Sequence, residues 1–158
     1  MVDPQTPGVT FGGGLVRSVL LARRLRKIWA GQEMVGLLLP PSVGGALANY
    51  AAFLMGKVPV NLNYTVSEQT LASCVQQCGI KTVLTSRAFL EKVKLTVPGE
   101  VVYLEDIAAN PGAGEKISAW LAAKLLPAAS LERSLRDGNE TNLDSLATVI
   151  FSSGSTGE

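Results

Sequence analysis

The sequence predicts an α/β fold in which a mostly parallel sheet is flanked by helices. Three observations lead to this prediction. Helical and strand patterns alternate through residues 14–104, the connections between them are short and contain Gly or Ser, and the first strand segment is a short run that is apolar throughout. Alternation with short connections is typical of a βαβ array around a parallel sheet. A wholly apolar strand fits burial on both faces of such a sheet.

The first predicted element is an amphipathic helix over residues 14–30, ended by Gly31 as a C-cap. Its apolar side chains recur at steps of three and four residues: Leu15, Val19, Ala22, Leu25 and Trp29. Its basic side chains fall largely on the other faces: Arg17, Arg23, Arg24 and Lys27. We expect this basic face to be solvated, and contact with an anionic membrane surface or a partner is the alternative.

Two strand patterns and a helix follow. Residues 34–39 form an apolar run that predicts a buried strand, and Ser42 is placed to cap the next helix. That helix is expected to reach about Met55 and to stop at Gly56. Residues 58–62 predict a second strand. Pro59 has no amide hydrogen to donate to a ladder, so we expect it at the start of a strand or on an edge strand.

Ser67 is predicted to cap a third helix that ends at Gly79. Its inner face consists of Leu71, Cys74, Val75 and Cys78. We expect both cysteines to be buried small side chains, because the sequence lacks partners for a metal site and two cysteines make no disulfide framework. Residues 81–85 predict a strand, Ser86 caps a short helix, and residues 101–104 predict another strand.

The patterns are weaker after Leu104. Glu105 and Asp106 imitate a ribose- or metal-binding pair of carboxylates, but we expect a solvated strand end. Residues 110–114 predict a turn, and residues 117–126 predict a helix with Trp120 and Leu121 facing inward. Residues 137–142 are polar and predict an exposed linker. Residues 146–151 then predict one more buried, apolar strand.

Composition excludes several classes of function. The 158 residues contain no histidine, so a Ser-His-Asp or Cys-His mechanism within this chain is excluded. The formal net charge of +1 gives no reason to expect a nucleic-acid partner. Prolines and glycines interrupt the apolar stretch over residues 35–62, so no membrane span is predicted there. Two cysteines and no visible signal peptide favour a reducing cytoplasm.

The final predicted strand runs directly into Ser152-Ser153-Gly154-Ser155-Thr156-Gly157-Glu158. Glycines permit tight turns close to a ligand, exposed amides form anion-binding concavities, and hydroxyls add neutral donors. This combination after a strand favours a phosphate-binding loop, with a flexible linker as the alternative. It is neither a Walker P-loop, which requires a lysine, nor the dinucleotide fingerprint, whose glycine spacing differs.

Residues 148–158 closely resemble the phosphate-loop motif of adenylate-forming enzymes, which include acyl-CoA and acyl-carrier-protein synthetases, peptide-synthetase adenylation domains and luciferases. In that family the motif continues with Pro-Lys-Gly. Residues 35–42, 56–63 and 79–85 resemble upstream stretches of the same family, so the similarity spans about residues 11–158. Within the family, Leu-Leu-Pro-Pro-Ser and Asn-Leu-Asn-Tyr-Thr most resemble long-chain acyl-acyl-carrier-protein synthetases.

The resemblance implies that residues 1–158 are a single N-terminal piece of the large adenylation domain, ending inside the phosphate loop. The parent enzyme would form an acyl-adenylate from ATP and a fatty acid with Mg²⁺, then transfer the acyl group to coenzyme A or acyl carrier protein. The implied ATP-binding residues are Ser152, Ser153, Gly154, Ser155, Thr156 and Gly157. Thr156 is also the expected metal-binding residue, and no catalytic residue is expected in the chain.

Further expectations follow from the resemblance. The isolated chain should be inactive and should self-associate through its exposed sheet. Its localisation is expected to be cytoplasmic, with any membrane association supplied by the rest of the parent protein. The alternative is a flavodoxin-like binding or interaction module whose Ser/Gly tail is only a linker.

Overall fold

The computed structural model describes residues 8–136 and 144–151. Within them, a single five-stranded sheet has the order β4-β3-β1-β2-β5, and every neighbouring pair is parallel. The strands are β1 (Met34–Leu38), β2 (Val58–Asn61), β3 (Thr82–Thr85), β4 (Glu100–Tyr103) and β5 (Val149–Ile150). The predicted α/β class with a parallel sheet is therefore confirmed.

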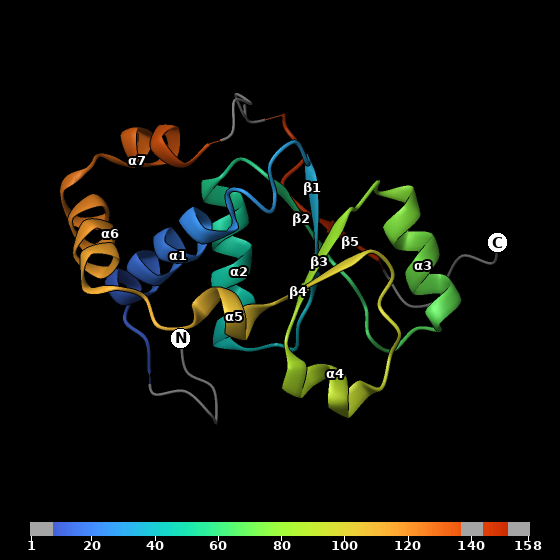
Figure 1. Cartoon of the computed structure of the whole chain (residues 1–158). Helices are drawn as coiled ribbons and strands as arrows, with labels where there is room; N and C mark the ends of the chain where they lie inside the picture. Colours follow the sequence, from blue (N-terminus) through green and yellow to red (C-terminus); the bar gives the residue numbers. More distant parts are fainter. Residues whose placement is uncertain (1–7, 137–143, 152–158) are drawn as a thin grey trace.

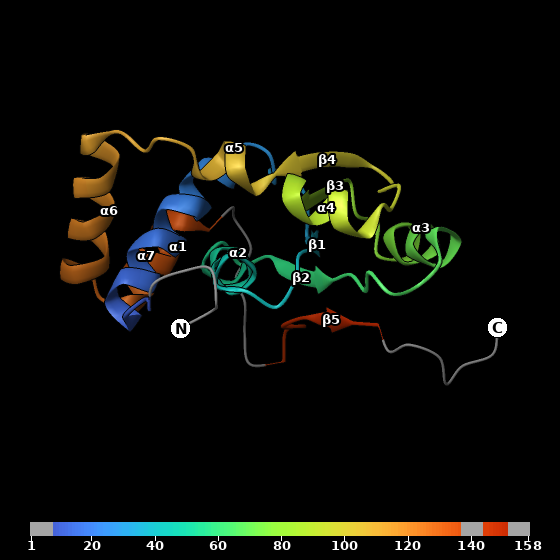
Figure 2. The ribbon, with the colours of Figure 1, turned by 90° about the horizontal axis from the view of Figure 1, so that it is seen from below.

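Helices cover both faces of this sheet (Figures 1 and 2). On one face lie α3 (Glu68–Gln77) and α4 (Arg87–Val93), and on the other lie α1 (Phe11–Leu25), α2 (Val43–Leu54), α5 (Leu104–Ala108), α6 (Ala113–Leu125) and α7 (Ala128–Leu135). The second group is stacked in depth, because α1 packs on α2 and α6 packs on the outer side of α1. Helix α6 is thus the layer farthest from the sheet.

The helix starts agree with the serine caps that the sequence predicts. The Oγ atoms of Ser42, Ser67 and Ser86 accept hydrogen bonds from the amides of Gly45, Thr70 and Phe89 at 3.1, 3.2 and 3.4 Å. Helix α1 instead begins earlier than predicted, because Thr10 accepts from the Gly13 amide at 3.2 Å. The capping hydroxyls satisfy amides that the first helical turn leaves without partners.

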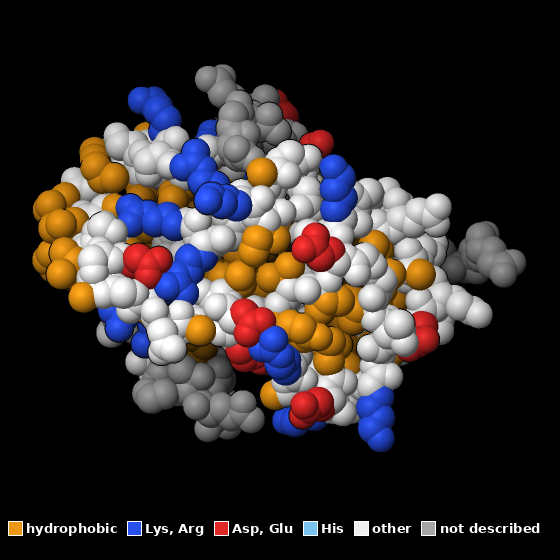
Figure 3. All heavy atoms as spheres, viewed as in Figure 1, with side chains coloured by type: hydrophobic (Ala, Val, Ile, Leu, Met, Phe, Trp, Pro, Cys, Tyr) orange, Lys and Arg blue, Asp and Glu red, His pale blue; other side chains and the backbone are white. Residues whose placement is uncertain are grey.

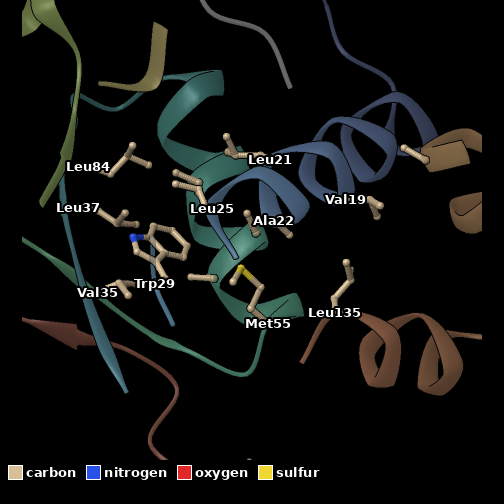
Figure 4. Packing of buried hydrophobic residues seen from close by; sticks show 14 of the residues in the cluster. Val19, Leu21, Ala22, Leu25, Trp29, Val35, Leu37, Met55, Leu84 and Leu135 are labelled. Carbon is tan, nitrogen blue, oxygen red and sulfur yellow. The ribbon is translucent and has the colours of Figure 1, made fainter. Parts of the chain in front are cut away.

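Apolar side chains on the two faces of the sheet form two cores. The larger core joins α1, α2, α6 and α7 to sheet residues such as Val35, Leu37 and Leu84. Trp29 is fully buried in it, beyond the end of α1 (Figure 4). The smaller core packs α3 and α4 on Leu38, Val60 and Val83.

Cys74 is buried, as predicted, and Cys78 is half-buried, and desolvation raises the pKa of both thiols.

The position predicted for Pro59 is only partly correct. Pro59 is the second residue of β2, which is close to a strand start, but β2 is an inner strand between β1 and β5. The amides of Val58 and Leu62 donate towards β1. Because successive backbone nitrogens along a strand point in opposite directions, the nitrogen of Pro59 points away from β1 and towards β5. The pairing of β2 with β5 begins only at Val60, so Pro59 removes no hydrogen bond between these two strands.

One prediction about the outer helices is wrong. In α6, Trp120 and Leu121 are 51% and 41% exposed, whereas Ala119 and Ala122 are buried. The small alanines allow α6 to lie close to α1, so the large side chains point outward. The helices α5 and α7 lie in the region where the sequence patterns are weak. The linker predicted over residues 137–142 lies outside the described residues.

The basic face of α1 is not simply solvated, because Arg24 holds α5 and α6 against it. The guanidinium donates to both carboxylate oxygens of Glu115, at 3.2 and 2.7 Å, and to the carbonyls of Ile107 and Ala109. Arg23 donates to Ser118 Oγ at 2.9 Å. These contacts join segments more than eighty residues apart, which is why the local pattern does not reveal them.

Acidification is expected to weaken the contact between α1 and α6. Hydrogen bonds from the Arg24 side chain, and then from the Gly112 amide, hold the pKa of Glu115 below its ordinary value of 4.5. A carboxyl whose pKa is lowered on folding stabilises the fold above its unfolded-state pKa, and that contribution is lost as the pH falls through the lowered value. Urea titrations should therefore show that the stability difference between wild type and Glu115→Gln shrinks below about pH 4. A difference that is constant across this range would contradict the expectation.

No helix among residues 8–136 and 144–151 is both long enough and apolar enough to cross a membrane. The interrupted stretch over residues 35–62 folds instead as the end of β1, then α2 and β2.

Candidate functional site

The carboxyl ends of the parallel strands meet at one edge of the sheet, and the candidate site lies there. Strand β5 pairs with β2, so that Val149 is opposite Val60 and Ile150 is opposite Asn61. Figure 2 shows β5 running beside β2 in the same direction. Ligands of open parallel sheets bind outside the carboxyl ends of the strands. The Ser/Gly-rich segment comes shortly after β5 in the sequence.

The predicted ATP-binding residues, Ser152, Ser153, Gly154, Ser155, Thr156 and Gly157, lie outside the described residues. The same is true of the metal-binding role predicted for Thr156. The structure does describe the strand that delivers the chain to them. That strand is shorter than the predicted residues 146–151. Contrary to the prediction it is not buried, because β5 is an edge strand and Ile150 is 73% exposed.

A ladder of polar side chains fastens β5 to the rest of the fold. Thr148 Oγ1 donates to the carbonyl of Pro59 at 2.8 Å and accepts from Asn61 Nδ2 at 3.5 Å. Asn61 and Asn49 exchange two amide hydrogen bonds, of 3.0 and 3.1 Å. Asn49 also donates to the carbonyl of Gly45 at 3.0 Å. The ladder therefore runs from α2 through β2 to the residue preceding β5.

The asparagines of this region have two different roles. Asn63 forms a local turn, because its Oδ1 accepts from the amide and hydroxyl of Thr65 at 2.9 and 2.8 Å. Asn61 lies in a strand and pairs across elements instead. The signal for this role was an asparagine within an otherwise apolar helix, at Asn49, because a half-buried amide requires partners.

A second polar cluster lies where β3 and β4 end. Glu105 accepts from the hydroxyl of Ser86 at 2.7 Å and from the amide of Arg87 at 3.0 Å. Arg87 binds Asp106 through two hydrogen bonds of 2.7 and 2.6 Å and lies 4.1 Å above the ring of Tyr103. The hydrogen bonds from Arg87 lower the pKa of Asp106. Both carboxylates therefore join α4 to α5. The sequence predicts that they are solvated at a strand end, whereas the structure shows that they bind neighbouring side chains.

The described part of the chain holds no group of three or more His, Cys, Asp or Glu side chains that could bind a metal ion. The ladder of Asn49, Asn61 and Thr148 uses its polar atoms internally. Phosphate binding is predicted for residues 152–157, which lie outside the described residues. Their hydroxyls and backbone amides are a set of neutral donors, and this donor chemistry fits the oxygens of a phosphate.

Comparison with known proteins gives matches over almost the whole chain. Residues 8–158 match the family model described as AMP-binding enzyme. O-succinylbenzoate coenzyme A synthetase from Bacillus subtilis in complex with AMP is similar at 20% identity and a TM-score of 0.68, over 99% of this chain and 35% of that chain. The N-terminal subdomain of NpsA from Klebsiella oxytoca is similar at 14% identity and a TM-score of 0.57, over 68% of this chain and 27% of that chain.

These structural matches show a shared fold. The chain spans about a third or less of the length of the solved structures it matches.

Proposed function

Because this chain belongs to the AMP-binding enzyme family, we propose that it is the N-terminal part of an ATP-dependent ligase that activates a carboxylic acid as its adenylate. The proposal rests above all on one observation. In the sequence, a Ser/Gly/Thr segment similar to the family's phosphate loop comes directly after the stretch that contains the parallel strand β5. The family match extends through that segment to residue 158.

The proposed reaction has two steps. A carboxylate oxygen attacks the α-phosphorus of ATP, the bond to the β-phosphate oxygen breaks, and acyl-adenylate and pyrophosphate are formed. A thiolate then attacks the acyl carbon, which forms a thioester and releases AMP. Mg²⁺, when bound, would neutralise charge on the phosphates.

This chain's own part in the reaction would be to hold the phosphates. Hydroxyls and amides of Ser152, Ser153, Gly154, Ser155, Thr156 and Gly157 would donate to the β- and γ-phosphate oxygens, with Thr156 also beside the metal ion. The ladder from Asn49 to Thr148 would keep β5 in register with β2. Positioning of this kind is a large part of catalysis when charge develops on a transferred group.

The substrate and the acceptor are finer proposals. One similar structure is described as o-succinylbenzoate CoA synthetase with its acyl-adenylate intermediate, and another as an artificially fused adenylation and carrier-protein di-domain of a peptide synthetase. Coenzyme A and a carrier protein are thus the two acceptor types suggested for this chain. We propose a fatty acid as the carboxylate, supported by the resemblance of residues 38–42 and 61–65 to long-chain synthetases.

The test compares the 158-residue chain with the longer gene product that we propose continues with Pro-Lys-Gly. The 158-residue chain should release no pyrophosphate from ATP in response to a fatty acid, because it holds at most part of the site. The longer protein should do so with Mg²⁺ present, and Thr156→Val should lower the rate by about 100-fold. Turnover by the 158-residue chain, or a stop codon directly after Glu158, would overturn the proposal.

A further inference from the structure

The outer side of α6 presents a stripe of large apolar side chains, which we name the α6 apolar face. Its members follow the first at three, four, eight and nine residues, the last being the C-cap of the helix, and all are at least 41% exposed: Ile117, Trp120, Leu121, Leu125 and Leu126. Figure 3 shows hydrophobic side chains gathered at the end of the molecule where α6 lies. Single exposed apolar residues are common, whereas a contiguous stripe marks an interaction site.

The α6 apolar face continues onto α1. A shallow depression of about 710 Å³ lies between the two helices. Its apolar lining comes from Val16 and Leu20 on α1 and from Pro111, Ile117 and Trp120 on the α6 side. The face is therefore wider than a single helix, and its centre is slightly hollow.

Cationic side chains border the α6 apolar face. Arg17 and Lys116 line the depression, and Lys124 lies seven residues after Ile117, two turns along the same side of α6. Within residues 8–136 and 144–151 none of these three cations forms an ion pair or a side-chain hydrogen bond. The acidic side chain of this helix, Glu115, is already held by Arg24 and the Gly112 amide. The rim is thus positive and unopposed.

The position of α6 separates this face from the candidate site. Helix α6 is the outermost layer, on the far side of α1 and α2 from the sheet, in both views of the ribbon. Strand β5, where the sheet is open to a further strand, lies on the other side of those layers. A chain that extends the sheet at β5 would not cover α6 by doing so.

From these observations we propose that the α6 apolar face binds an anionic lipid surface, with α6 lying in the plane of the interface. An interfacial helix buries its apolar side chains at the boundary of the headgroups and acyl chains, and its cations are attracted by anionic lipids. The amphipathic ring of Trp120 suits that boundary. Lys116 and Lys124 have stems long enough to cover apolar surface while their charges stay in water. This proposal does not depend on the ligase activity.

A second copy of the chain would fit the face less well. Two copies that meet through this face would bring Arg17, Lys116 and Lys124 of each copy close to the same cations of the other, because symmetric contacts use the same patch on both copies. Like charges facing one another across an interface disfavour the contact. An anionic lipid surface satisfies the apolar stripe and the positive rim together.

The experiment measures binding of the 158-residue chain to vesicles. Equal parts of phosphatidylcholine and phosphatidylglycerol form the anionic vesicles, and phosphatidylcholine alone forms the neutral ones. Co-sedimentation should show binding to the anionic vesicles that falls as salt is raised. The chain contains two tryptophans, and Trp29 is fully buried, so a blue shift of the fluorescence on binding should report Trp120. Absence of binding, or equal binding to neutral vesicles, would overturn the proposal.

Variants identify the face. The double variant Lys116→Gln, Lys124→Gln should bind about 25-fold more weakly, at about five-fold for each cation near an anionic surface. The matched control, Lys92→Gln with Lys94→Gln, removes the same charge from α4 on the opposite side of the sheet and should bind like wild type. Equal losses in both pairs would mean that only net charge matters, which would overturn the assignment to α6.

A separate variant tests the apolar stripe. Leu125→Glu should abolish the fluorescence shift while circular dichroism stays unchanged, because Leu125 is 70% exposed and contributes little to the core. Size-exclusion chromatography without lipid is run on the same proteins. If the wild-type chain is an oligomer, Leu125→Glu dissociates it and lipid binding is unchanged, then the α6 apolar face binds a second copy of the chain and the proposal is wrong.

Discussion

Replacing Trp29 by alanine is expected to lower the free energy of unfolding by about 3–5 kcal/mol. The indole is fully buried in the larger core, where β1, α1 and α2 come together (Figure 4). Neighbouring side chains come from separate elements, including Val35 on β1 and Met55 after α2. These elements are held by their own hydrogen bonds, so the core would close the cavity only in part. Urea denaturation followed by far-ultraviolet circular dichroism measures the loss.

The matched control is Trp29→Phe. The indole Nε1 of Trp29 is buried, and no described residue accepts a hydrogen bond from it. A buried donor without a partner costs about 1–3 kcal/mol, so phenylalanine removes that cost while it keeps much of the apolar volume. We therefore expect Trp29→Phe to lose much less stability than Trp29→Ala. Equal losses in the two variants would contradict the expectation that retained apolar volume limits the loss.

Replacing Asn61 by leucine is expected to lower the free energy of unfolding by about 1–3 kcal/mol and to loosen β5. The change leaves the half-buried amide of Asn49 without two of its hydrogen bonds and removes the donor to Thr148. Strand β5 pairs with β2 over only two residues. Its amides should therefore exchange hydrogen faster in the variant, as measured by NMR or mass spectrometry.

The double variant Asn49→Leu, Asn61→Leu tests the reason for this loss. When both amides are replaced, neither partner is left unsatisfied, so the double variant should recover part of the stability lost by Asn61→Leu. Exchange at β5 should stay fast, because Thr148 still lacks the Asn61 donor. Additive losses from the two substitutions would contradict the reciprocal pairing of the amides.

Much of the fold was predictable because its determinants are local. The apolar run at residues 34–39 and the caps at Ser42, Ser67 and Ser86 each depend on neighbours within a few residues. The strand at residues 146–151 was predicted from the same kind of run, but only Val149 and Ile150 pair, and they lie at an edge. An apolar run predicts an extended strand. It does not predict whether the strand will have a neighbouring strand on one side or on both sides.

Of the candidate site, the sequence predicts the phosphate-binding segment but not the side chains that fasten the strand before it. The composition of residues 152–157 and the strand before them predicted a phosphate-binding segment, and the family match includes it. The ladder that fastens the strand was not predicted, because Asn49 and Asn61 are twelve residues apart and Thr148 is a further eighty-seven. A single polar residue in an apolar segment indicates that a partner exists but not which one.

By itself, the sequence determined the alternation of helices and strands, the serine caps and the parallel α/β class, because periodicity and capping depend on contacts a few residues apart. Tertiary structure decided which surface α6 turned inward. Helix α6 faces α1 with Ala119 and Ala122 because Arg24 binds Glu115 and small side chains permit close approach. Its large apolar side chains were therefore left outside. Such choices depend on segments about ninety residues apart, whose meeting no local pattern records.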